Sequence, residues 1–165
     1  MANRTAWTGG NGQGLTYGTL INSSDMTTGP LGNVQTVLST VADIANGSNL
    51  DIYMDISYKL AIASNTIAAG ANFSFWLYYL NQDGATYGDG QFTAGTAATL
   101  TPAFPPCAVV GIPAVASTTN MFGTATGIII PPGSFRVAIQ NNSGFSLTAG
   151  TQTVQYRTYN TQLNN

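Results

Sequence analysis

The sequence predicts an all-β protein, built as an antiparallel β-sandwich of about eight strands. Thr occurs 23 times, and a β-branched residue with a hydroxyl group suits a pleated, half-exposed sheet surface. Hydrophobic residues make up 44% of the chain, including two Trp, eight Tyr and seven Phe that can fill a core, whereas only 6% of the residues are charged. Several segments alternate apolar and polar residues, and none shows a clear helical period.

The first candidate strand spans residues 34–44, where the apolar residues fit both a helical face and a period of two. We favour the strand because β-branched residues are frequent in this segment. In addition, Asn46-Gly47-Ser48-Asn49 is a turn sequence that leads directly into another strand. The helical alternative for 34–44 stays open at this point.

The clearest local signal lies in residues 50–63. Seven apolar residues, from Leu50 to Ile62, occupy every second position, which turns one face of a strand toward the core. At about 3.3 Å per residue such a strand would be about 40–45 Å long. We therefore expect it to bend or to support two pairings.

Residues 73–80 are apolar on both faces of the expected strand, and Asn81-Gln82-Asp83-Gly84 ends it with hairpin residues. Two sets of side chains are expected: Phe73, Phe75, Leu77 and Tyr79 in the interior, and Trp76, Tyr78 and Leu80 on the opposite face.

The stretch 85–120 is rich in Gly, Thr, Ala and Pro and resembles a loop, with a short apolar piece at 108–112. Because structureless stretches of this length are unusual in a compact domain, we expect it to hold one or two short strands and a surface excursion. The C-terminal third returns to strands, separated by the turns Pro131-Pro132-Gly133 and Asn141-Asn142-Ser143-Gly144. These strands are expected at 127–130, 134–140 and 153–159.

Together these segments make about eight strands at even spacing, for which a jelly roll of two antiparallel sheets is the natural solution. Residues 1–33 are expected to form an extended N-terminal arm, because the glycines of Gly9–Gly14 cannot hold a helix. A short strand within this arm, at 15–21, stays open. The jelly-roll domain is assigned to residues 34–165.

Catalysis is not expected, since the chain has no His and no Glu and only one Lys and one Cys. Acid–base chemistry, nucleophile activation and metal binding depend mainly on these residues. The few cations are scattered, so the chain lacks the basic stripe of a nucleic-acid-binding surface. No segment reads as a signal peptide or a membrane span. We predict no cofactor, no nucleic-acid partner and no membrane partner.

Glycines and carboxylates offer two weak candidate sites. Gly9–Gly14 superficially resembles a phosphate loop but lacks the Gly-Lys-Ser/Thr ending, the preceding strand and the following helix. Asp83 and Asp89, surrounded by glycines, could hold Ca²⁺, but their spacing matches no calcium loop and Asp-Gly is ordinary turn chemistry. We interpret both segments as structural.

Asp51, Asp55 and Lys59 fall on one face of the strand at 50–63, at intervals of four residues. A catalytic carboxylate pair would need an apolar pocket that raises the pKa of one member. A solvated face with a lysine nearby argues against such a pocket. We interpret the three residues as surface charges that suppress edge-to-edge aggregation.

Two further side-chain types are considered. Trp76, Tyr78 and Tyr79, with Tyr53 and Tyr58, could form an aromatic platform for sugars, but packing in the core or at an interface is favoured. Cys107 has no partner for an intrachain disulfide, and we interpret it as a small buried hydrophobic residue.

The C-terminal third resembles a known family. The segment Ile130-Pro131-Pro132-Gly133-Ser134-Phe135-Arg136-Val137-Ala138-Ile139-Gln140-Asn141-Asn142-Ser143-Gly144, followed by Val154-Gln155-Tyr156-Arg157-Thr158-Tyr159-Asn160, resembles the end of the jelly-roll decoration (cement) proteins of short-tailed bacteriophages. The strand Leu50-Asp51-Ile52-Tyr53-Met54-Asp55 fits the same pattern, whereas residues 1–33 and 85–120 match nothing in that family.

The resemblance implies a virion structural protein that is not an enzyme. Such a jelly-roll subunit, usually a homotrimer, sits on the outer capsid surface after assembly in the host cytoplasm and bridges copies of the major capsid protein. The contacts expected on this basis come from the N-terminal arm and the C-terminal strand: Arg4, Trp7, Leu15, Tyr17, Arg157 and Tyr159. The alternative is a carbohydrate- or receptor-binding head domain of a phage fibre, which would use Trp76 and the loop at 85–120.

Overall fold

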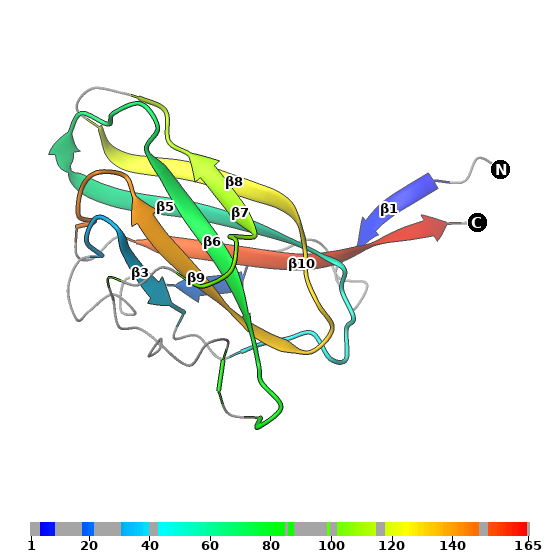
Figure 1. The fold of residues 1–165 in the computed structure, drawn as a ribbon. Coiled ribbons are helices and arrows are strands. Elements are labelled where there is room, and N and C mark those ends of the chain that lie inside the picture. Colours follow the sequence, from blue (N-terminus) through cyan, green and yellow to red (C-terminus); the bar gives the residue numbers. More distant parts are fainter. Residues whose placement is uncertain are drawn as a thin grey trace.

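The chain folds into two packed antiparallel β-sheets in a computed structural model (Figure 1). The structure describes residues 4–8, 18–21, 31–39, 43–84, 86–87, 99, 102–114, 118–148 and 152–164. These residues contain ten strands and no helix. The predicted all-β class and the antiparallel sandwich are therefore confirmed.

The first sheet is built around the two longest central strands of the molecule. Its strands are β1 (Arg4–Thr8), β2 (Gly18–Ile21), β5 (Tyr53–Asn65), β8 (Thr118–Ile129) and β10 (Thr153–Asn164). They are hydrogen-bonded in the order β1-β10-β5-β8, and β2 also pairs with β10. Every pairing is antiparallel.

The second sheet faces the first across the core. Its strands are β3 (Gln35–Leu38), β4 (Ile44–Ala45), β6 (Asn72–Tyr79), β7 (Ala108–Gly111) and β9 (Ser134–Asn142). They are hydrogen-bonded in the order β3-β9-β6-β7, and β4 pairs with β9 beyond the end of β3. The chain crosses repeatedly between the two sheets, so each sheet joins segments that are distant in sequence.

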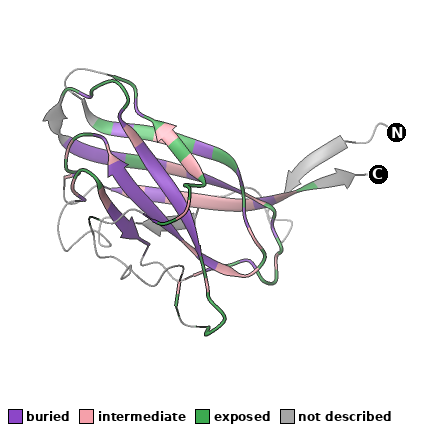
Figure 2. Cartoon of the chain, viewed as in Figure 1, coloured by how far each residue is buried: buried purple, intermediate pink, exposed green. Residues whose placement is uncertain are grey.

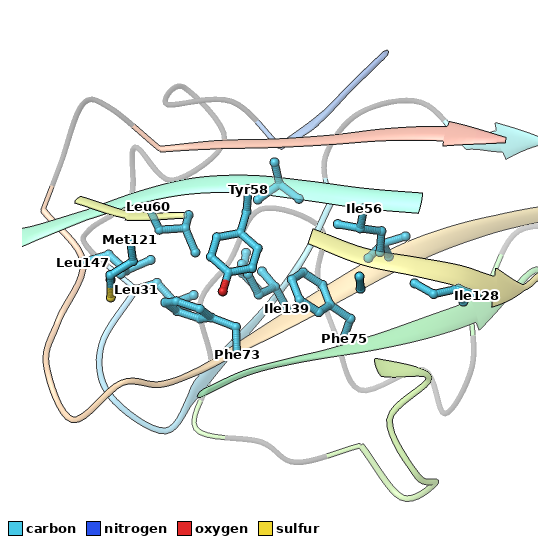
Figure 3. Packing of buried hydrophobic residues seen from close by; sticks show 14 of the residues in the cluster. Leu31, Ile56, Tyr58, Leu60, Phe73, Phe75, Met121, Ile128, Ile139 and Leu147 are labelled. Atoms are coloured by element: carbon cyan, nitrogen blue, oxygen red, sulfur yellow. The ribbon is translucent and has the colours of Figure 1, made fainter. Parts of the chain in front are cut away.

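The core lies between the sheets and is filled by alternate side chains of both. Tyr58, Phe73 and Phe75 stand at its centre, and the Tyr58 ring lies 5.1 Å from the Phe73 ring in an edge-on arrangement (Figure 3). Figure 2 shows β6 and β9 buried almost throughout, whereas β8 alternates between buried and exposed residues. The period-two pattern therefore directs the apolar residues of β5 inward from Met54 to Ile62, as predicted.

The outer face of the second sheet is also covered. Trp76 and Tyr78 of β6 pack with Leu38 and Ala138 in a second apolar cluster, against which Tyr87 and Phe104 from the 85–120 stretch are packed. The side chains on the outer face of the first sheet, in contrast, include exposed Lys59, Phe122 and Thr124. The outer face of the second sheet is thus covered by apolar side chains, whereas side chains on the outer face of the first sheet are exposed.

Several predicted elements are confirmed and others are corrected. The described residues of the predicted strand at 34–44, which are 34–39 and 43–44, hold β3 and the start of β4 and no helix. The strand predicted from Leu50 begins only at Tyr53, and Leu50 and Ile52 are exposed because they precede the paired part of β5. Tyr79, expected inside, is 48% exposed because it is the last residue of β6.

β8 was largely missed by the sequence analysis, which expected a strand only at 127–130. It starts at Thr118, inside the stretch interpreted as a loop, and runs for 12 residues. Its sequence is rich in Thr and Gly, which masks an alternation of Met121, Gly123 and Ala125 with Phe122 and Thr124.

The N-terminal residues contribute strands to the sandwich. β1 pairs with the end of β10, and β2, within the segment left open at 15–21, pairs with β10 further back. Leu31, which the predicted arm includes, is 1% exposed and belongs to the core. The division into an arm at 1–33 and a domain at 34–165 stays a prediction.

Candidate interaction surfaces

Arg157 and Tyr159, two of the predicted contact residues, are held by a buried carboxylate. Asp55 on β5 is 3% exposed, and its Oδ1 accepts hydrogen bonds from the Tyr159 hydroxyl and the Gly127 backbone N–H, both at 2.9 Å. Its Oδ2 lies 2.9 Å from Arg157 Nε and 2.8 Å from Arg157 Nη2. One carboxylate therefore ties β5 to both β10 and β8. We call these four residues the Asp55 clamp.

The electrostatics of the Asp55 clamp suit a structural role. Burial raises the pKa of the Tyr159 hydroxyl, and the hydrogen bond to Asp55 and the charge of Asp55 raise it further. The Tyr159 ring also stacks on Tyr53 with ring centroids 5.7 Å apart. Since the carboxylate is neutralised and its acceptor positions are occupied, it is poorly placed for acid–base chemistry.

The interpretation of Asp51 and Asp55 as solvated surface charges is wrong. Asp51 is 2% exposed, and its Oδ1 accepts a hydrogen bond of 3.0 Å from Asn160 Nδ2. The Asn46 side chain accepts from the Asp51 N–H and donates to the carbonyl oxygens of Asp51 and Pro131. Neighbouring segments thus cover both carboxylates, whereas Lys59 is exposed as expected.

The end of β10 forms a two-stranded ribbon with β1. β5 pairs with β10 only up to Tyr159, and β2 pairs with it only up to Tyr156, so residues 160–164 of β10 pair with β1 alone. Figure 1 shows this ribbon extending beyond the two sheets, with both chain termini at its tip. The register places Trp7 opposite Thr161 and Arg4 opposite Asn164.

The ribbon therefore brings two predicted contact residues of the N-terminal arm, Arg4 and Trp7, next to the C-terminal strand. Arg157 and Tyr159 lie at its root. Leu15 and Tyr17, the remaining two residues of the predicted interface, lie outside the described residues.

Exposed apolar side chains gather at the root of the ribbon. Leu50, Ile52 and Ile129 are 57%, 49% and 73% exposed. Ile129 lies opposite Tyr53, and the Ile52 carbonyl accepts from the Ile130 N–H at 3.0 Å, so the three residues share one end of the first sheet. The Ile52 N–H donates to Asn160 Oδ1 of the ribbon at 2.9 Å. We call these three residues the end patch.

Leu50 of the end patch has a φ of +52°, in the left-handed region that favours glycine. Its N–H donates to the Asn46 carbonyl at 3.1 Å, and Asn46 in turn holds Asp51. A hydrogen-bonded loop therefore maintains a strained backbone that presents an apolar side chain to solvent.

The aromatic platform proposed for sugars is not formed. Trp76 and Tyr78 are 3% and 1% exposed, and the Trp76 indole N–H donates to the Phe104 carbonyl at 2.9 Å. Tyr58 lies in the core, and Tyr53 lies on the outer face of the other sheet. Because the loop side chains cover Trp76, the favoured interpretation as packing residues holds for Trp76 and Tyr78.

The weaker candidates are structural where the structure describes them. Asp83 caps a turn, since its Oδ1 accepts from the Thr86 N–H at 3.0 Å and its Oδ2 from the Thr86 hydroxyl at 2.5 Å. Asp89 and the Gly9–Gly14 segment lie outside the described residues. Within the described ranges, no three His, Cys, Asp or Glu side chains gather closely enough to hold a metal ion.

Cys107 is an exposed residue, which corrects its interpretation as a buried one. It lies just before β7, where its backbone N–H donates to the Phe75 carbonyl at 2.8 Å and its thiol to the same oxygen at 3.2 Å. Although the residue as a whole is exposed, its thiol lies against the Phe75 carbonyl, and this local desolvation raises the pKa of Cys107 to about 12, so the reactive thiolate is scarce at neutral pH.

No protein-family model, no curated protein and no solved structure matches this chain. In the part of the chain that the structure describes, no helix is long and apolar enough to cross a membrane.

Sequence reasoning missed the end patch and the exposed Phe122, which is 65% exposed on β8. Leu50 and Ile52 were assigned to the core because they continue the alternation of β5. The turn at 46–49 is the sequence signal that could have identified them, because the residues just after a turn can precede the paired part of a strand, and β5 starts only at Tyr53.

Proposed function

We propose that this protein is a virion structural protein, a capsid decoration (cement) protein that binds the outer surface of a phage head and stabilises contacts between major capsid proteins. The proposal is supported by the resemblance of the C-terminal third and of the strand at 50–55 to the decoration proteins of short-tailed bacteriophages. The proposal includes self-association, as the homotrimer that the resemblance implies, and no enzymatic activity.

We further infer that the sandwich is a jelly roll. β3 and β4 pair with the same strand, β9, whose other edge is occupied by β6, so they count as one interrupted strand. From β2 onward the described residues then contain eight strands, of which the first pairs with the last, the second with the seventh, the third with the sixth and the fourth with the fifth. This nested pairing is what a long antiparallel hairpin produces when it is rolled into two sheets.

The observation that carries the proposal is the ribbon of β1 and the end of β10. An isolated two-stranded ribbon is marginally stable in water, because it has no sheet or layer against which to pack. A ribbon that extends beyond its own sandwich is therefore suited to packing on another molecule. It carries Arg4 and Trp7, and its root carries Arg157 and Tyr159.

The surroundings of the ribbon fit a protein partner. The end patch places three exposed apolar side chains at its root. Of the two carboxylates nearby, Asp55 is paired with Arg157. Asp51, which lies in sequence between two residues of the end patch, is buried and accepts a hydrogen bond from Asn160. Apolar side chains with few unpaired charges are typical of the centre of a protein interface. Many identical copies on one shell would multiply a modest affinity for each site through avidity.

Deletion of residues 1–14 tests this proposal. The truncated chain should keep its circular dichroism spectrum and unfold within about 3 °C of the full chain, because β1 pairs only with the end of β10. Its occupancy on shells of the source particle that lack the protein, measured by co-sedimentation, should fall at least ~10-fold, the loss of about 1.4 kcal/mol per site.

A matched surface change controls for general effects on binding. Thr66, exposed in the connection after β5, lies in a different part of the chain, and Thr66→Lys should leave the occupancy unchanged. Truncated chain that occupies the shells as fully as the complete chain would show that the ribbon is not the attachment site.

A further inference from the structure

Three of the four sheet edges are formed by short strands, and the fourth is not. β1 and β2 at one edge have five and four residues, β3 and β4 have four and two, and β7 has four. β8, at the remaining edge, has 12. Short edge strands are one way in which proteins avoid pairing with other chains. β8 does not use it.

β8 also lacks two of the other protections, Pro and charge, although the register shift between Ala125 and Ile128 marks a β-bulge near Gly127, whose φ is +67°. Its sequence, TTNMFGTATGII, contains no Pro and no charged residue, which are the usual means of blocking an edge. It carries two strongly exposed apolar side chains instead, since Phe122 is 65% and Ile129 is 73% exposed. Lys59 on β5 lies beside one of them, since its Nζ is 5.9 Å from the Phe122 ring centre.

The outer edge of β8 is open over most of its length. β5 pairs with one edge of β8, and the Gly127 N–H donates to Asp55 on that side. From residue 121 to residue 129, no hydrogen bond joins the other edge to a strand or a loop within the described parts of the chain. Among the described residues, a row of backbone donors and acceptors on this edge is therefore open to a further strand.

We propose that β8 pairs with β8 of a second copy of this chain, antiparallel around a two-fold axis. A strand edge is self-complementary under this symmetry, because each donor meets the acceptor of the symmetry-related residue. Nine residues interrupted by the bulge near Gly127 would form about six to eight backbone hydrogen bonds, within the number found in a whole protein interface. Since β8 is uncharged, no like charges on the paired strands oppose the contact.

The attachment ribbon, formed by β1 and the end of β10, lies at the other edge of the first sheet, although Ile129 of β8 also belongs to the end patch at its root. The pairing concerns the isolated protein, so it holds or fails independently of capsid binding. It joins subunits in pairs, whatever further contact a homotrimer makes through other surfaces.

Light scattering on the full-length chain at 10–200 µM, about the range in which weak interfaces are detected, provides the test. The mass should approach an even multiple of the 17.1 kDa monomer. Thr124→Lys places a cation on the exposed face near the middle of the open edge, and two such cations meet in the pair. It should weaken the pairing at least ~10-fold, whereas Thr66→Lys, with the same charge change, should have no effect.

Mixing two variants shows that Thr124→Lys acts through the contact and not through misfolding. Thr124→Lys and Thr124→Asp should each fail to pair alone but should form a mixed pair, because opposite charges then face each other across the two-fold axis. Hydrogen exchange should show added protection at alternate amides of 121–129 as the concentration rises.

Three results would overturn this proposal. These are a chain that is monomeric throughout the concentration range, a self-association that Thr124→Lys leaves unchanged, and variants that fail to pair when mixed. If the chain is monomeric, any strand that pairs with the open edge of β8 must come from a different protein. Deletion of residues 1–14 should leave the pairing intact, so a failed capsid test and a failed pairing test are distinguishable.

Discussion

Tyr58 and Gly123 fit together across β5 and β8 because one of them has no side chain. They are partners in the register, and Tyr58 is 3% exposed with its ring in the core. A Cβ atom at Gly123 would lie 2.5 Å from Tyr58 Cζ and 2.7 Å from its Cε1, well inside van der Waals contact. An aromatic ring that covers a cross-strand glycine in this way is a known means of stabilising a sheet.

Gly123→Ala should therefore lower the free energy of unfolding by ~1–3 kcal/mol, the usual cost of an overpacked core. Chemical denaturation of the purified variant measures this change. Gly111→Ala is the matched control, because Gly111 lies in β7 with no atom within 4 Å of its added Cβ, and it should cost almost nothing. Equal losses at the two positions would show that Tyr58 does not restrict Gly123.

At the scale of elements, the Asp55 clamp strengthens the attachment of β10 to the first sheet. The backbone ladder alone aligns β10 with β5, but the carboxylate adds bonds to Arg157 and Tyr159 of β10 and to Gly127 of β8. Because the carboxylate is buried, leaving any of its partners unpaired carries a desolvation cost. The ribbon that we propose as the attachment site begins one residue beyond this clamp.

Asp55→Asn should lower the free energy of unfolding by ~2–4 kcal/mol, since the amide removes the charge and turns N–H donors toward the donors of its partners. Asp83→Asn, an equivalent change at an exposed turn, should cost less than ~1 kcal/mol. Both values follow from urea denaturation. Adding Arg157→Met to Asp55→Asn should cost less than the sum of the single changes, whereas full additivity would contradict the clamp.

At the scale of the whole molecule, the composition predicts an unusual dependence of stability on pH. The chain has no His and no Glu, and the pKa of Cys107 is raised to about 12, so few side chains titrate between about pH 5 and pH 9. Burial of Tyr58 raises its pKa to about 12, and its hydroxyl has no hydrogen-bond partner among the described residues. Burial also raises the pKa of Tyr156.

The free energy of unfolding should therefore be constant from about pH 5 to pH 9 and should fall between about pH 10 and pH 12. A pKa that is higher in the folded state favours folding while the group is protonated. That contribution is complete below the unfolded pKa of about 10 and is lost as the pH rises through the folded value. Tyr58 alone would account for roughly 3 kcal/mol of the fall.

Tyr58→Phe isolates this contribution. At pH 7 the variant should be as stable as the parent or up to ~1 kcal/mol more stable, because it removes an unpaired buried hydroxyl. At pH 11.5 it should be clearly more stable than the parent. Urea denaturation at the two pH values checks both expectations, and parallel losses of stability in parent and variant at high pH would contradict the role of Tyr58.

Within single elements, much of the fold could be predicted from the sequence. The alternation of β5, the aromatic strand β6, the turns at 46–49 and 131–133, and the strands β9 and β10 follow from local patterns, because a strand displays its two faces residue by residue. The poverty in charge and the absence of His and Glu are likewise properties of the sequence alone. The local patterns therefore predict the all-β class, and the absence of His and Glu predicts a stability that hardly responds to pH near neutrality.

Only the tertiary structure decided which faces and edges are covered. Asp55 is buried because Arg157 and Tyr159 come from a strand about 100 residues further along the chain, and Trp76 is buried because Phe104 lies over it. Local alternation predicts which side chains lie on the same face of a strand. Whether that face is buried depends on segments that are distant in sequence, and a period of two in the sequence does not identify those segments.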